Sequence, residues 1–121
     1  MPGYFLDAYA MLEILKANKA YDAYLDDDLA TSILHRYEVH YHLLHELGPE
    51  EAAQGVAAFR PMEVAIEEDD MLEASAFRLE HRRARLSYAD ALGYAMARRR
   101  GSRFLTGDEA FRTLRGVEFV K

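Results

Sequence analysis

The sequence contains no cysteine among its 121 residues. The absence of thiols excludes a disulfide framework, a thiolate metal site and a cysteine nucleophile, and it is compatible with a reducing cytosol. No basic and apolar leader opens the chain, and no apolar run approaches the roughly 20 residues that span a bilayer. We therefore expect a cytoplasmic protein that makes no membrane contact. Half of the residues are hydrophobic, which suits a single domain over residues 1–121 with a real core.

Glycine is missing where nucleotide-binding proteins need it. The first expected strand ends at Asp7, and Ala8-Tyr9-Ala10 follow without a glycine, which argues against a Rossmann-type cofactor site. No Walker-type phosphate loop occurs elsewhere. Tyr9 also stands where a haloacid-dehalogenase-like phosphatase would carry the second aspartate of its Asp-x-Asp motif. The sequence therefore argues against these classes of nucleotide-binding and phosphatase site.

The formal net charge of −6 conceals two halves of opposite sign. Residues 1–73 hold sixteen acidic and four basic residues, whereas residues 74–121 hold five acidic and eleven basic ones. The planar fork of arginine suits phosphate, so Arg82, Arg83 and Arg85 are candidates for binding nucleic acid or an acidic partner. The alternative interpretation is that Arg82, Arg83 and the arginines at 98–100 are solvated helix ends.

Short apolar segments alternate with helical patterns along the whole chain. We expect strands at 4–6, from Leu29, at 62–66, at 104–105 and at 117–120. We expect helices after Asp7, from Thr31 or Ser32 to Leu47, at 49–58, from 67 to about 83 and from Ser87 to about Arg100. Such alternation predicts a parallel sheet that helices cover on both faces.

The helix that ends at Leu47 has two features of interest. The helical spacing of Leu34, Tyr37, Tyr41 and Leu44 predicts its core-facing stripe. Four histidines also lie along this helix, but their order His-Leu-Leu-His-Glu differs from the His-Glu-x-x-His zinc motif. We therefore interpret the histidines as surface or partly buried side chains rather than as zinc ligands.

Four separate acids are candidates for one site. Each has an ordinary structural explanation, since Asp7 can cap a helix and Glu38 can complement a helix dipole. Ligands bind at the carboxyl ends of parallel strands, where Asp7 and Asp108 both fall. Glu38 and Asp90 lie in the first turns of helices that follow such connections, so they can point into the same crevice. We interpret the acids at 26–28 and 67–70 as a solvated turn and as helix-dipole charges.

Several of these segments together resemble a known family. They are Phe5-Leu6-Asp7 before a helix, Glu38 in the second long helix, Ser87-Tyr88-Ala89-Asp90-Ala91, and the run from Phe104 to Phe111 that contains Thr-x-Asp-x-x-Phe. Their order and spacing resemble the PIN domain, particularly its small VapC-like members, over essentially the whole chain. The resemblance implies a three-layer α/β/α sandwich with a central, mostly parallel sheet.

The same resemblance implies a metal-dependent nuclease that hydrolyses phosphodiester bonds, usually in RNA. By it, the catalytic and metal-binding acids are Asp7, Glu38, Asp90 and Asp108, with Thr106 beside the metal and Glu109 as a weaker auxiliary acid. Mg²⁺ and Mn²⁺ prefer oxygen ligands and need only a few carboxylates plus substrate phosphate. No nucleophile from the protein is required.

The resemblance also implies partners. A VapC-like chain would be the toxin of a type II toxin–antitoxin pair, silenced by a small antitoxin whose basic segment or C-terminal helix enters the acidic crevice, and it would form a homodimer. The alternative is a non-catalytic interaction module with a PIN-like fold. Binding of divalent metal by the four acids distinguishes the two.

Overall fold

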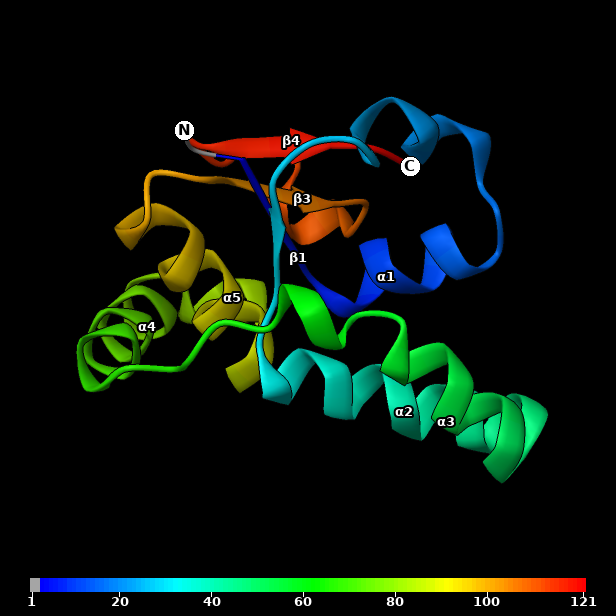
Figure 1. Ribbon diagram of the computed structural model, residues 1–121. Helices are drawn as coiled ribbons and strands as arrows, with labels where there is room; N and C mark the ends of the chain where they lie inside the picture. Colours follow the sequence, from blue (N-terminus) through cyan, green and yellow to red (C-terminus); the bar gives the residue numbers. More distant parts are fainter. Residues whose placement is uncertain (1–2) are drawn as a thin grey trace.

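The computed structural model describes residues 3–121 and has a four-stranded sheet at its centre (Figure 1). The strands are β1 (Tyr4–Leu6), β2 (Leu29–Ala30), β3 (Arg103–Thr106) and β4 (Val117–Phe119). Their order across the sheet is β2-β1-β3-β4, and every neighbouring pair is parallel. Leu6 pairs with Leu105 at the carboxyl ends of the two central strands. The residues that follow these strands therefore begin side by side.

Helices connect the strands, as parallel pairing requires. The α-helices are α1 (Ala8–Leu15), α2 (Ile33–Leu47), α3 (Pro49–Ala57), α4 (Glu68–Glu80) and α5 (Tyr88–Arg99). Four short 3₁₀ turns complete the chain, η1 (Lys19–Tyr24), η2 (Arg60–Met62), η3 (Arg82–Ala84) and η4 (Glu109–Phe111). Within residues 3–121, none of the helices has the length and apolar character to cross a bilayer.

Side chains alternate across the sheet and supply two cores. Phe5 and Phe104 face the layer of α4 and α5, whereas Leu6 and Leu105 face the layer built by α1, α2 and α3. Figure 1 shows α4 and α5 together on one side of the strands and α1, α2 and α3 on the other. Residues 91–97 of α5 are all buried, as expected for an apolar helix that lies between a sheet and a second helix. The predicted three-layer α/β/α architecture is confirmed.

The strand that we expected over residues 62–66 does not form. Residues Arg60–Met62 make the turn η2, and only an isolated bridge links Thr31 to Glu63. Two backbone hydrogen bonds hold this bridge, from the Thr31 N–H to the Met62 oxygen and from the Val64 N–H to the Thr31 oxygen. Ile66 is exposed, so the segment lacks a buried face that would extend the pairing.

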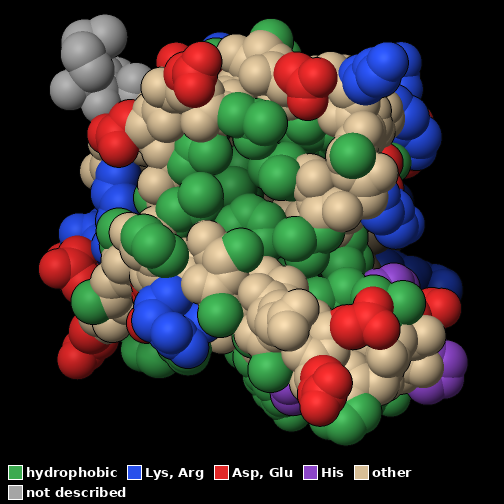
Figure 2. Space-filling model, turned by 45° about the vertical axis from the view of Figure 1, so that its right-hand side comes forward, with side chains coloured by type: hydrophobic (Ala, Val, Ile, Leu, Met, Phe, Trp, Pro, Cys, Tyr) green, Lys and Arg blue, Asp and Glu red, His purple; other side chains and the backbone are tan. Residues whose placement is uncertain are grey.

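The predicted core stripe of α2 was wrong. Tyr37 and Tyr41 are 66% and 68% exposed, whereas His35, Val39 and Leu43 are buried. Both sets have helical spacing, but of the predicted stripe only Leu34 packs against a core. Figure 2 shows a face of the molecule on which hydrophobic side chains gather in a hollow, with acidic and basic side chains around it. Exposed apolar surface of this kind commonly marks a binding site.

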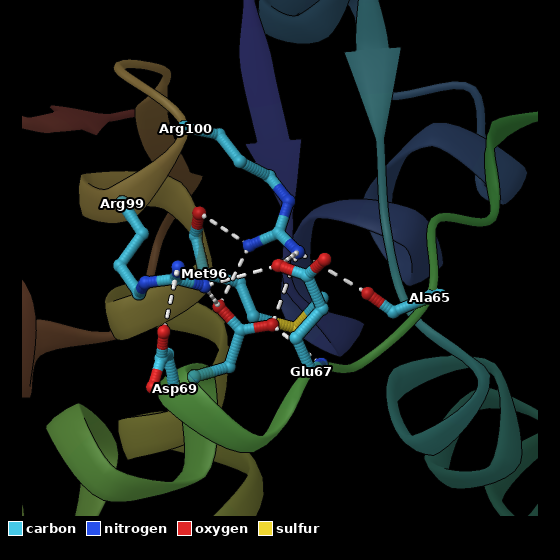
Figure 3. Close-up of polar contacts among 7 residues, drawn as sticks. Ala65, Glu67, Asp69, Met96, Arg99 and Arg100 are labelled. Atoms are coloured by element: carbon cyan, nitrogen blue, oxygen red, sulfur yellow. Dashed lines mark hydrogen bonds and ion pairs between the residues drawn. The ribbon is translucent and has the colours of Figure 1, made fainter.

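Asp70 of α4 is ion-paired with two arginines at the end of α5. Our interpretation of this residue as a helix-dipole charge alone was wrong. Its side chain is fully buried, and Oδ1 accepts hydrogen bonds from Arg99 and Arg100, both at 2.8 Å. Its Oδ2 accepts from the Glu67 N–H at 2.8 Å, within the capping box of α4. Figure 3 shows Arg99 and Arg100 reaching from the end of α5 to this cluster. Two of the arginines that could have been solvated helix ends are therefore ion-paired.

The end of α4 also differs from expectation. The helix ends at Glu80 rather than near Arg83, because residues 82–84 form the turn η3 and Arg85 adopts a left-handed backbone with φ of 56°. The three residues of this turn, Arg82, Arg83 and Ala84, are all exposed. It brings the chain back to Ser87, which caps α5 with its hydroxyl.

A candidate acidic site at the carboxyl end of the sheet

Asp7 occupies the junction between β1 and α1 and is only 5% exposed. Its Oδ1 accepts a hydrogen bond from the Ala10 N–H at 2.8 Å, so it caps α1. Its Oδ2 accepts a hydrogen bond from the Thr106 hydroxyl at the end of β3. Burial raises the pKa of Asp7 to about 7, although these two hydrogen bonds act in the opposite direction. Asp7 is therefore a buried carboxyl that titrates near neutral pH.

Thr106 and Asp108 form the neighbouring corner of the site. The Thr106 hydroxyl is fully buried and accepts a hydrogen bond from the Asp108 N–H at 3.0 Å while it donates to Asp7. Asp108 Oδ1 in turn accepts from the Ala110 N–H at 3.0 Å and caps η4. One threonine thus links the two aspartates that follow the two central strands.

Asp90 lies in the first turn of α5 and takes part in a capping box. Its Oδ2 accepts a hydrogen bond from the Ser87 N–H at 2.9 Å, while its own N–H donates to the Ser87 hydroxyl at 3.0 Å. Burial raises the pKa of Asp90; the Ser87 contacts oppose the shift and the charge of Asp108 adds to it. Asp90 therefore has a structural role, because its Oδ2 helps to cap α5. Its other carboxylate oxygen, Oδ1, takes no part in the capping box.

Glu38 enters from α2 and is half-buried. Burial raises its pKa, and the charge of Asp90 raises it further. Glu38 also lines a groove of about 510 Å³ between α1 and α2, together with Ala8, Leu12, Tyr37, Tyr41 and His42. Glu38 is the one of the four candidate acids that lines this groove.

The four candidate acids come from four different parts of the chain, and the charges of some raise the pKa values of others. Asp90 and Asp108 both raise the pKa of Asp7, and Asp90 raises that of Glu38. Within residues 3–121, however, no three acidic or histidine side chains are close enough together to hold a metal ion as they stand. The donor set of carboxylate oxygens suits Mg²⁺ or Mn²⁺, but ligation would require side-chain adjustments that draw the carboxylates together.

Glu109 follows Asp108 directly, but its carboxylate contacts basic side chains. It is exposed, and its carboxylate pairs with Arg112 at 3.0 Å and with Lys121 at 3.3 Å. Its partners therefore direct it toward the basic C-terminal region rather than toward Asp7. The role of auxiliary acid has no support from these contacts.

The three candidate arginines lie on and beside η3. All three are exposed, and Arg82 donates to the Leu79 oxygen at 3.1 Å. Arg82 and Arg85 line a second groove of about 590 Å³ that also includes Tyr88. None of the four candidate acids lines this groove.

His35 was not singled out as a site residue, yet it lies among the elements that carry the acids. Its ring is 1% exposed and bridges Ser32 to the backbone oxygen of Ala89. The available signal was its four-residue spacing from Val39 and Leu43, which places it on the buried face. A second stripe with helical spacing, which includes Tyr37 and Tyr41, concealed that signal.

Comparisons with known proteins point to one family. A family model described as the PIN domain matches residues 4–117. Among curated protein sequences, none is significantly similar to this chain. Solved structures give several matches over nearly full length.

VapC20 of Mycobacterium tuberculosis, described as a sarcin–ricin loop cleaving toxin, aligns with a TM-score of 0.81 at 22% identity, over 98% of this chain and 100% of that one. A toxin–antitoxin complex from Klebsiella pneumoniae aligns with a TM-score of 0.75 at 18% identity, over 96% of each chain. DNA-bound VapBC from Salmonella typhimurium aligns with a TM-score of 0.72 at 17% identity, over 99% and 98%. At these identities the similarity concerns the fold.

Proposed function

The chain belongs to the PIN domain family, and from that premise we propose that it is an endoribonuclease that depends on Mg²⁺ or Mn²⁺ and acts as the toxin of a type II toxin–antitoxin pair. The observation that carries the proposal is electrostatic coupling among four acids from separate elements. Burial raises the pKa of Asp7, Glu38 and Asp90, and the charge of at least one other acid of the set raises each further, Asp90 and Asp108 for Asp7, Asp90 for Glu38, and Asp108 for Asp90. Carboxyls with raised pKa values that gather at one edge of a sheet are typical of a functional site.

Asp7, Glu38, Asp90 and Asp108 would supply the oxygen ligands, and Thr106 would fix the orientation of Asp7. When bound, the divalent ion would activate a water for attack on phosphorus and neutralise charge on the leaving 3′ oxygen. Because the pKa of Asp7 is about 7, this carboxyl must lose a proton before it can serve as a ligand at neutral pH.

RNA as the substrate class is supported by the basic surface on and beside η3. Arg82, Arg83 and Arg85 offer cations for the phosphate backbone, and Tyr88, which is exposed, lines the same groove as Arg82 and Arg85. VapC20, which shares the fold, is described as a toxin that cleaves the sarcin–ricin loop. If these arginines hold RNA, replacing all three with serine should flatten the dependence of log affinity on log salt. An unchanged slope would return them to solvated surface.

An antitoxin partner is supported by the exposed face of α2. Tyr37 and Tyr41 line the groove that contains Glu38, and Ile33 and Leu44 extend the exposed apolar face along the helix. An apolar helix of the antitoxin would cover this face, and a basic segment after it would reach the acids. Replacing Tyr37 and Tyr41 with serine should then weaken co-purification with the product of a short upstream open reading frame. A homodimer and a cytoplasmic location remain predictions that follow from the family.

The nuclease proposal is tested with purified protein and unstructured RNA. Cleavage should appear with Mg²⁺ or Mn²⁺, disappear with EDTA, and be largely lost in Asp7→Asn, Asp90→Asn and Asp108→Asn. Glu38→Gln should also be severely impaired, although a water can partly replace its oxygen. Asp26→Asn removes one negative charge from an exposed turn and is the matched control. Equal cleavage by Asp7→Asn and the wild type would refute the site.

A second candidate function is a non-catalytic interaction module with the PIN fold. The spacing of the acids favours it, because no three of the described side chains meet at ligand distance. The capping box of Asp90 favours it too, because that carboxylate already has a structural task. Calorimetric titration with Mn²⁺ separates the two functions, since the module should bind no ion at the acids.

A further inference from the structure

His35 connects the first turns of α2 and α5 through both nitrogens of its ring. Its Nδ1 lies 2.6 Å from the Ser32 hydroxyl, which caps α2, and its Nε2 lies 2.8 Å from the Ala89 backbone oxygen in α5. Within residues 3–121, this is the only hydrogen bond between α2 and α5. One hydrogen bond from one side chain therefore connects the two helices that carry Glu38 and Asp90.

The partners of the ring fix where its proton lies. The Ala89 carbonyl oxygen can only accept, so Nε2 carries the proton and donates it. Nδ1 is then an acceptor, and the Ser32 hydroxyl donates to it. Burial lowers the pKa of His35 to about 4, against the effect of the Ala89 contact. The neutral tautomer that makes both hydrogen bonds is thus the form present at neutral pH.

The space around the ring is fitted to an imidazole. The Phe5 ring of β1 packs edge-on against it with centroids 5.3 Å apart. On the α5 side, a Cβ atom at position 93 would lie 2.7 Å from Nε2. Gly93 therefore leaves the room that the ring fills, and a larger residue there would push the imidazole away from Ala89.

His35 and two of the residues that it contacts lie close in sequence to acids of the proposed site. Phe5 precedes Asp7 by two residues on β1, Ala89 immediately precedes Asp90, and His35 itself lies one helical turn before Glu38. A shift of the first turn of α5 away from α2 would therefore change the separation of Glu38 and Asp90 directly. Small displacements of this kind are expensive, because about 1 Å of misplacement can cost a hundredfold in rate.

We propose that His35 is a positioning residue whose imidazole holds the first turn of α5 against α2 and so sets the separation of Glu38 and Asp90. The tether itself is a property of the fold, whereas its consequence for cleavage rests on the proposed function. The two parts therefore need separate measurements.

The test compares His35→Gln with His35→Met. The glutamine amide reaches about as far as Nε2 and can donate to the Ala89 oxygen, whereas methionine fills similar space without a donor. Hydrogen exchange at the Asp90 and Ala91 amides reports the tether. It should speed up about tenfold in the methionine variant, in keeping with the loss of one hydrogen bond, and change little in the glutamine variant. His45→Gln and His45→Met, on the exposed end of the same helix, are the matched controls.

The consequence is measured as Mn²⁺ affinity and as RNA cleavage. Relative to glutamine, methionine should lower the affinity for Mn²⁺ and lower kcat about tenfold or more while KM for RNA stays unchanged. Equal exchange rates in all three proteins would overturn the tether. Faster exchange in the methionine variant with unchanged Mn²⁺ affinity and kcat would show that His35 is only structural, which also overturns the proposal.

Two further outcomes are decisive. If the wild type neither binds Mn²⁺ nor cleaves RNA, the proposed function fails, and hydrogen exchange alone then decides whether His35 holds α5. If the methionine variant does not fold, the comparison moves to His35→Gln against His35→Asn, whose shorter amide ends near the position of Nδ1 and does not reach the Ala89 oxygen. Faster exchange at Asp90 in His35→Asn than in His35→Gln would then support the tether through Nε2, and equal rates in the two variants would overturn it.

Discussion

The Thr106 hydroxyl donates a hydrogen bond to the Asp7 carboxylate across 99 residues of sequence, joining the carboxyl ends of β3 and β1. Both side chains are buried, and the same hydroxyl accepts from the Asp108 N–H. The contact lowers the pKa of Asp7 against the larger effect of burial. One buried threonine therefore keeps this acid closer to its ionised form.

Thr106→Val should raise the pKa of Asp7 further, because it removes the donor and retains the shape of the side chain. If ionised Asp7 is required for cleavage, the acid limb of the pH–rate profile should move up by about one pH unit. Thr106→Ser keeps the hydroxyl and should leave the profile near that of the wild type. A valine variant with an unmoved profile would contradict the role of Asp7 ionisation.

Asp7→Asn should stabilise the fold at neutral pH while it abolishes cleavage. The folded pKa of about 7 lies above the unfolded value near 4, so Asp7 favours folding most at low pH and loses this contribution as the pH rises through 7. Asparagine caps a helix about as well as aspartate. The free energy of unfolding at pH 7, measured with urea, should rise by up to about 4 kcal/mol. A destabilised Asp7→Asn protein would argue against the raised pKa.

His35 should have the opposite effect on stability. Its folded pKa of about 4 lies below the unfolded value of 6.5, so its contribution is complete above pH 6.5 and is lost as the pH falls toward 4, by about 3 kcal/mol. In the wild type, Asp7 and His35 largely offset each other over this interval. Asp7→Asn should therefore lose stability steeply on acidification from pH 6.5, and the additional change His35→Gln should flatten that loss.

Asp70→Asn should destabilise the protein by about 3 kcal/mol or more, because it leaves Arg99 and Arg100 partly buried without their carboxylate. Although burial alone would raise it, hydrogen bonds from Arg100, the Glu67 N–H and Arg99 hold the pKa of Asp70 well below its usual range. Asp69→Asn is the matched control, since Asp69 is exposed and lies 3.6 Å from Arg99. Its melting temperature should stay within a degree or two of the wild type.

Metal should raise the melting temperature of the wild type. An ion present at about 100 times its dissociation constant adds roughly 2.7 kcal/mol to stability. Asp90→Asn keeps an oxygen for the capping box, so it should melt at or above the wild-type temperature in EDTA and lose most of the rise with Mn²⁺. If no ion raises the melting temperature of the wild type, the non-catalytic module becomes the better account.

Local sequence patterns determined most of the architecture. The apolar run of α5 between Ser87 and Gly101, and the short strands around Phe5 and Phe104, were sufficient to predict a parallel sheet between helical layers, because such segments bury both faces. The rule that ligands bind at the carboxyl ends of parallel strands brought Asp7 and Asp108 to the same edge. These predictions rest on periodicity and position, which a single sequence displays.

Tertiary structure decided what periodicity leaves open. Two helical stripes on α2 had the right spacing, and only packing against the sheet selected His35, Val39 and Leu43 over the tyrosines. Asp70 is buried because two arginines from the far end of α5 reach it, 29 and 30 residues away in sequence. A side chain's hydrogen-bond partners and its burial depend on segments that meet only in the folded chain. The sequence could therefore propose the acids and Thr106, but neither the hydrogen bond from Thr106 to Asp7 nor the buried contacts of His35.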